Sequence, residues 1–134
     1  MPTWQPLLDR LTRLRETWPG GPWTWDGRFA TVGSAFAIDD EPRARASAMA
    51  AFPQGYTMKS LASAPPALIA FAERTGGLRA GQRLLAGGVD GRGLYGLWWP
   101  WGSDDRITLR IGLLDHGADA EPMPRLLALF DVKR

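Results

Sequence analysis

The chain contains no cysteine and only one histidine, His116. Without cysteine there is no disulfide framework, no thiolate metal site and no cysteine nucleophile. With a single imidazole, a zinc site built from several histidines is excluded, and only one histidine base is available for catalysis. These absences remove several common classes of enzyme and metalloprotein.

Long apolar runs are also missing, because no stretch approaches the roughly 20 residues that a membrane helix needs. Residues 1–6 lack a basic region followed by an apolar core, and charged residues between Asp9 and Glu16 interrupt the sequence that follows. We therefore expect a cytoplasmic protein without a membrane partner.

The chain also has little excess of positive over negative charge. Lysine and arginine together number 16, against 14 aspartates and glutamates, and the formal net charge is only +2. The charges are spread along the chain, so the calculated pI of about 9.5 does not reflect a basic patch in the sequence. A nucleic-acid partner is not expected.

The motifs that suggest catalysis are better explained by turns and strands. His116 lies between Asp115 and Asp119, a pattern that fits a polar turn better than a metal or base site. Residues 91–96 match G-x-G-x-x-G, but they lead into a strand where a dinucleotide site requires a helix. Ser34 lacks the G-x-S-x-G turn of serine hydrolases. We predict no catalytic residue, metal or cofactor; whether the chain is an enzyme is left open, and a non-enzyme is favoured.

The length of 134 residues, 45% of them hydrophobic, matches one globular domain over 1–134. Three helices are predicted from apolar spacing and from proline and glycine at their ends. They cover residues 4–17, residues 41–51, and a segment that begins near Pro65-Pro66 and ends at Gly76-Gly77.

Strands are predicted in the remaining segments. A hairpin over 23–38 turns at Asp26-Gly27, and strands 82–86 and 94–99 flank a glycine-rich turn at 87–93. Residues 106–113 alternate, which predicts a strand with Arg106, Thr108 and Arg110 facing outward. Residues 126–132 fit either period, and the preceding prolines favour a strand. The predicted fold class is α+β, an antiparallel sheet of about five to six strands with two or three helices packed on one face.

The segment 94–105 contains three of the seven tryptophans beside a proline, glycines and an acidic pair. Side chains alternate along a strand, so Trp98 and Trp99 are expected on opposite faces, with at least one partly exposed. One interpretation is an aromatic and acidic binding surface; the other is that the indoles fill the space between sheet and helices. The predicted partner-binding residues are Trp98, Trp99, Trp101, Asp104 and Asp105.

Residues 66–77, Pro-Ala-Leu-Ile-Ala-Phe-Ala-Glu-Arg-Thr-Gly-Gly, resemble the Pro-x-x-hydrophobic-x-x-Phe helix of the Smi1/Knr4-like (SUKH) superfamily. That helix ends in Asn-Gly or Gly-Gly, and Thr75 occupies the position where the family usually has asparagine. Bacterial members of the superfamily include many immunity proteins against secreted toxins. The resemblance implies a non-catalytic α+β protein that neutralises a toxin or effector by binding it.

The leading hypothesis is therefore a small cytoplasmic protein-binding module, of the immunity or antitoxin kind. Two alternatives stay open. One is a pocket domain of nuclear-transport-factor-2-like shape that binds a small ligand or acts as an enzyme with little histidine, with Asp26, Asp39 or Asp115 pointing into its cavity. The other is a carbohydrate-binding protein with stacked, coplanar tryptophans. The oligomeric state is not predicted.

Overall fold

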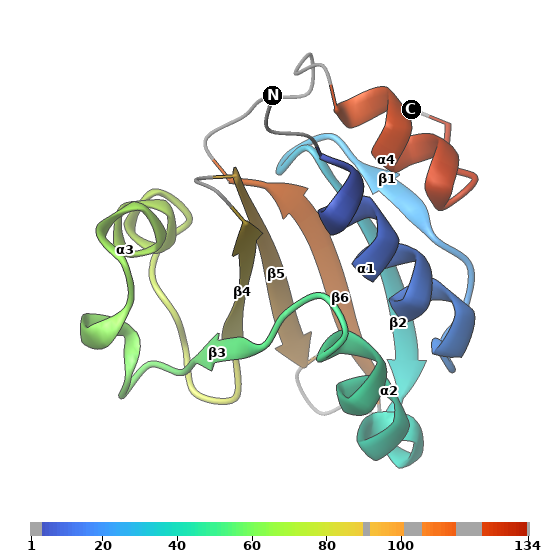
Figure 1. Ribbon diagram of the computed structural model, residues 1–134. Coiled ribbons are helices and arrows are strands. Elements are labelled where there is room, and N and C mark those ends of the chain that lie inside the picture. Colours follow the sequence, from blue (N-terminus) through green and yellow to red (C-terminus); the bar gives the residue numbers. More distant parts are fainter. Residues whose placement is uncertain (1–3, 90–91, 101–105, 115–121, 134) are drawn as a thin grey trace.

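The computed structural model describes residues 4–89, 92–100, 106–114 and 122–133 (Figure 1). Its centre is a six-stranded antiparallel sheet with the strand order β1-β2-β6-β5-β4-β3. The strands are β1 (Thr24–Asp26), β2 (Thr31–Ala37), β3 (Gln54–Tyr56), β4 (Arg83–Val89), β5 (Arg92–Pro100) and β6 (Arg106–Leu113). The helices are α1 (Gln5–Thr17), α2 (Glu41–Ala48), α3 (Pro66–Arg74) and α4 (Met123–Leu129). The predicted fold class is confirmed.

The larger core lies between one face of the sheet, here called the first face, and the helices α1, α2 and α4. Helix α1 contributes Leu7, Leu8, Leu11 and Leu14, all buried, at the spacing that places them on one side of a helix. The sheet contributes large apolar side chains from its central strands, including Phe36, Trp98, Leu109 and Ile111.

A smaller core lies on the opposite, second face. Helix α3 covers β4 and β5 there, because Leu68 and Ala72 pack with Leu84, Tyr95 and Leu97. Figure 1 shows α3 beside β4, apart from the other helices. Among the residues that the structure describes, no helix covers the part of the second face formed by β1, β2 and β6.

The predicted strand over 126–132 is wrong, because this segment forms α4 and the turn that follows it. Leu126, Leu127 and Phe130 are buried at helical spacing against the first face. A strand would need a neighbouring strand for its backbone hydrogen bonds. A helix satisfies the same groups locally.

The glycines assigned to a turn at 87–93 lie mostly within the hairpin strands. Gly87 pairs with Leu94 and Gly88 pairs with Gly93, so β4 and β5 extend further than predicted. A Cβ atom at Gly87 would collide with the carbonyl oxygen of Ala51. Close approach of another backbone segment, and not a turn, therefore requires glycine at Gly87.

Candidate functional site

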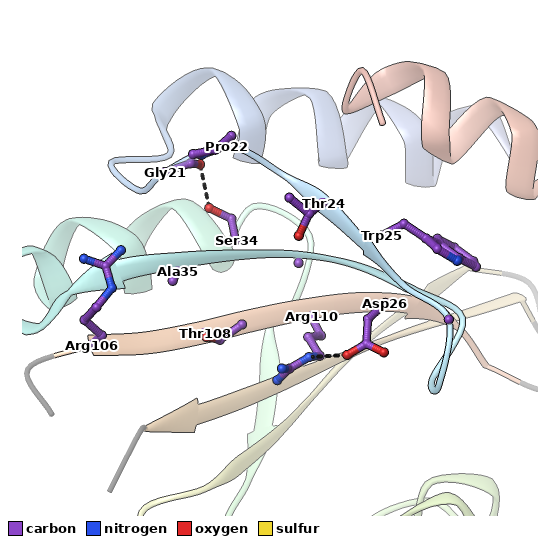
Figure 2. A pocket seen from close by; sticks show the side chains of 12 residues that line it. Gly21, Pro22, Thr24, Trp25, Asp26, Ser34, Ala35, Arg106, Thr108 and Arg110 are labelled. Atoms are coloured by element: carbon purple, nitrogen blue, oxygen red, sulfur yellow. Dashed lines mark hydrogen bonds and ion pairs between the residues drawn. The ribbon is translucent and has the colours of Figure 1, made fainter. Parts of the chain in front are cut away.

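The helix-free part of the second face forms a concavity of about 430 Å³, here called the main concavity (Figure 2). Strands β1, β2 and β6 supply most of its lining, and the loop before β1 supplies its rim. The lining residues are Gly21, Pro22, Thr24, Trp25, Asp26, Gly27, Gly33, Ser34, Ala35, Arg106, Thr108 and Arg110.

The strand register explains why the main concavity is hollow. Gly33 pairs with Arg110 and Ala35 pairs with Thr108, so β2 contributes only small side chains beside β6. The loop before β1 is held at the rim by Ser34, whose Oγ donates to the carbonyl oxygen of Gly21 at 2.7 Å. A floor of small residues below a fixed rim permits close approach of another chain.

Asp26 is the centre of a charged cluster at one end of the main concavity (Figure 2). Its Oδ2 accepts a hydrogen bond from Arg110 Nε at 3.1 Å and one from Arg28 Nη2 at 3.2 Å. Its Oδ1 accepts from the Arg28 backbone N–H at 3.0 Å. The Arg28 hydrogen bond, with the positive charges of Arg28 and Arg110, outweighs burial and lowers the pKa of Asp26. Asp26 is therefore ionised at neutral pH.

A second concavity of about 290 Å³ adjoins the first and shares Arg110 with it. It is lined by Arg28, Phe29, Gln82, Trp99, Pro100 and Arg110. Trp99 is half-buried, meets Phe29 edge to face at 5.6 Å between ring centroids, and lies 5.5 Å from the guanidinium carbon of Arg110. The Arg110 guanidinium is thus placed by a carboxylate and by an aromatic ring.

Tyr95 fixes the hairpin turn between β1 and β2. Its hydroxyl donates to the Phe29 carbonyl oxygen at 2.9 Å, next to Ala30, whose φ of 53° is rare for a residue with a side chain. Burial, together with the negative charge of Asp26, raises the pKa of Tyr95 to about 12. Tyr95 is therefore neutral, and able to donate, over the whole physiological range.

Of the five residues that the sequence placed in one binding surface, the structure describes Trp98 and Trp99. Trp98 and Trp99 lie on opposite faces of β5, as predicted. Trp98 is 4% exposed and packs against Phe36 in the larger core, where it also lines a small hollow of about 40 Å³. Trp99 is accessible from the second concavity. Trp101, Asp104 and Asp105 lie outside the described residues. Because Trp98 and Trp99 lie on opposite faces of β5, these two indoles do not form one stacking platform together.

The sequence reasoning missed the arginine cluster. The alternation in 106–113 placed Arg106 and Arg110 correctly on one face of β6, but Thr108 and Arg110 are only 7% and 8% exposed. The partner of Arg110 is Asp26, 84 positions away in the chain, so no local pattern reveals the pair. The sequence suggests Asp26 only as a carboxylate that points into a cavity. Asp39 is exposed and lies outside the site. Asp115 and His116 lie outside the described residues.

Across the four described ranges, no group of three or more His, Cys, Asp or Glu side chains is arranged to hold a metal ion. Within the same part of the chain, no helix has both the length and the apolar character required to cross a membrane.

Comparisons with protein-family models, with curated proteins and with solved structures found no match to this chain. Its function is therefore inferred from the geometry of the site.

Proposed function

We propose that this chain is a small binding module that engages another protein through the main and second concavities. The observation that supports this proposal is that the two concavities share Arg110 and are formed by four strands and the turn between β1 and β2. Such a surface is broad and open on the outer side of the sheet, whereas a small-molecule site usually encloses most of its ligand.

The chemistry of the cluster favours binding over catalysis. A general base must have a pKa near the working pH, but the pKa of Asp26 is lowered by the arginines that it contacts. Its carboxylate oxygens are also occupied by hydrogen bonds from Arg28 and Arg110. Asp26 therefore acts as a fixed negative group that orients two arginines.

Trp99 and Arg110 are the proposed anchors of the interface. Tryptophan and arginine are the residues most enriched among those that dominate binding energies, and they do so when a partner excludes water from them. Trp99 is held by Phe29 and Arg110 by Asp26, so neither side chain has to be ordered when the partner binds. Trp99 is also one of the partner-binding residues that the sequence predicts.

The proposed biological role is neutralisation of a toxin or effector by binding, as for immunity proteins and antitoxins. It is supported by the SUKH-like motif in residues 66–77. This segment folds as α3, and Gly76 and Gly77 after it both have positive φ. Helix α3 lies on the same face of the sheet as the two concavities.

The test is affinity capture of the tagged chain from its native cytosol, followed by calorimetry with the purified captured protein. We expect one stoichiometric partner, and we expect Trp99→Ala to weaken its binding at least tenfold, the loss typical of a central aromatic anchor. The matched control is Met49→Ala, which shortens a side chain that is 62% exposed and lines neither concavity. Absence of a partner, or equal binding by wild type and Trp99→Ala, would refute the proposal.

A second candidate function is binding of a small ligand. The volume of the main concavity, about 430 Å³, lies within the roughly 300–1,000 Å³ typical of ligand sites, and Asp26 lines it as that alternative requires. A thermal-shift screen with small anions and metabolites distinguishes the two functions. A ligand that stabilises the wild type but not Arg110→Gln would favour the pocket, provided that no protein partner is captured.

A further inference from the structure

Among the described residues that line the two concavities, arginines outnumber carboxylates. Arg28, Arg106 and Arg110 oppose Asp26, so three positive charges face one negative charge. An excess of positive charge in a hollow favours an anionic partner and accelerates its approach.

Asp26 shows how this surface holds a carboxylate. Arg110 approaches it from β6 and Arg28 from the turn after β1, and both donate to the same oxygen, Oδ2. The side chain of Arg28 is 74% exposed, so a carboxylate of a partner can reach it from solvent. Asp26 is thus an internal carboxylate that occupies the arginines in the absence of a partner.

Arg106 lies toward the other end of the main concavity (Figure 2). It is exposed and forms no ion pair with any residue that the structure describes. Arg106 and Arg110 are four residues apart on β6, which separates their Cα atoms by about 13 Å. Gly33, Ala35 and Thr108 form the floor between them.

We propose that the main concavity binds an acidic segment of the partner protein, with one carboxylate paired to Arg106 and a second competing with Asp26 for Arg28 and Arg110. This inference rests on the proposed function and adds the chemistry of the partner. Two cationic positions about 13 Å apart exceed the span of a single carboxylate or phosphate but match about four residues of extended chain. The low floor accommodates the main chain between the two carboxylates, and guanidinium groups bind carboxylates in a paired geometry.

The competition has a direct consequence for one variant. Asp26→Asn removes the internal charge while preserving the size of the side chain and one oxygen acceptor. The carboxylate charge that competes with the acidic segment for Arg28 and Arg110 is then absent, so we expect this variant to bind the segment about three- to tenfold more tightly than the wild type. If Asp26 only supported the fold, its replacement would leave affinity unchanged or reduce it.

The experiment uses fluorescence anisotropy with the full chain and a labelled oligo-glutamate peptide, with oligo-glutamine of equal length as the neutral control. We expect saturable binding of oligo-glutamate alone, weakened about tenfold by Arg106→Ala and decreasing as ionic strength rises. The matched control is Arg13→Ala, which removes the same charge from the exposed side of α1, on the opposite face of the sheet. Circular dichroism verifies that each variant is folded; if Asp26→Asn is not, Arg28→Gln replaces it, with weaker binding expected.

Four outcomes would overturn the inference: no binding of oligo-glutamate, equal losses for Arg106→Ala and Arg13→Ala, no gain in affinity for a folded Asp26→Asn, or binding of inorganic phosphate or oligothymidylate as tight as that of oligo-glutamate. The result is separable from that of the capture experiment. A captured partner that depends on Trp99, together with no affinity for oligo-glutamate, would refute the acidic chemistry and leave the binding module intact.

Discussion

At the residue scale, the position of Asp26 determines the character of the site. Its carboxylate lies where the β1–β2 hairpin meets β6, and it aligns Arg28 and Arg110 without neutralising the whole surface. Arg110 is 8% exposed and contacts both Asp26 and the ring of Trp99. Removal of Asp26 would leave a buried guanidinium without this carboxylate, so the residue has a structural as well as a binding effect.

Tyr95 provides a prediction about alkaline stability. Its pKa is about 12 in the folded chain and 10 in the unfolded one, so the folded state retains the proton over this interval. The contribution is fully present below about pH 10, and the free energy of unfolding falls by about 2–3 kcal/mol as the pH rises from about 10 to 12. Urea unfolding at pH values on either side of 10 measures this loss.

The control for that measurement is Tyr95→Phe, which lacks the titrating hydroxyl and its bond to the Phe29 carbonyl. We expect it to be less stable than the wild type at neutral pH but to lose less stability above about pH 10. Identical alkaline slopes for the two proteins would contradict the account of Tyr95.

Local patterns predicted Trp98 and Trp99 on opposite faces of their strand, because alternation is a property of the strand itself. They did not predict which indole lies in the larger core, because that depends on the helices that cover each face. Trp98 is buried beneath the helices of the first face, whereas Trp99 is next to the concavity. Predictions for single residues therefore hold where the geometry of the strand determines them. They fail where packing against the helices determines them.

At the element scale, the strands of the site were predictable and the last helix was not. Apolar and polar residues alternate along β6 with a period of two, which fits a strand and not a helix. The same alternation predicts which face of the sheet each residue lies on. The apolar residues of α4 fit two periods, and the choice between helix and strand depends on packing against the first face, where Leu126, Leu127 and Phe130 are buried. This packing joins segments far apart in the chain, so the sequence of the segment itself does not contain it.

Strand β4 provides a test of packing between elements. Gly87→Ala places a methyl group against the backbone carbonyl of Ala51, which is not a flexible side chain, so we expect a loss of about 1–3 kcal/mol in the free energy of unfolding. Gly21→Ala is the control, because its added carbon meets the Ala35 carbonyl oxygen at an ordinary 3.6 Å. Denaturant unfolding that ranks the two variants equally would argue against this close approach of Ala51.

At the scale of the whole molecule, the strand order creates the site. The strand β6 follows β5 in the chain, yet it lies between β5 and β2, which brings the early hairpin beside the late strand. Helix α3 covers the other half of the second face, and no helix within the described ranges covers β1, β2 and β6. The fold class followed from the predicted elements, but this order, and with it the arginine-lined surface, arises from long-range pairing.

The central claim is that the helix-free part of the second face is the binding surface, and an NMR titration tests it most directly. The isotope-labelled chain is titrated with the purified captured partner, and amide and indole shifts are followed. We predict the largest changes at Thr24–Asp26, Thr31–Ala35, Thr108–Arg110 and the Trp99 indole, with little change in α1, α2 and α4. Changes centred on the helices of the first face, with the second face unaffected, would contradict the account.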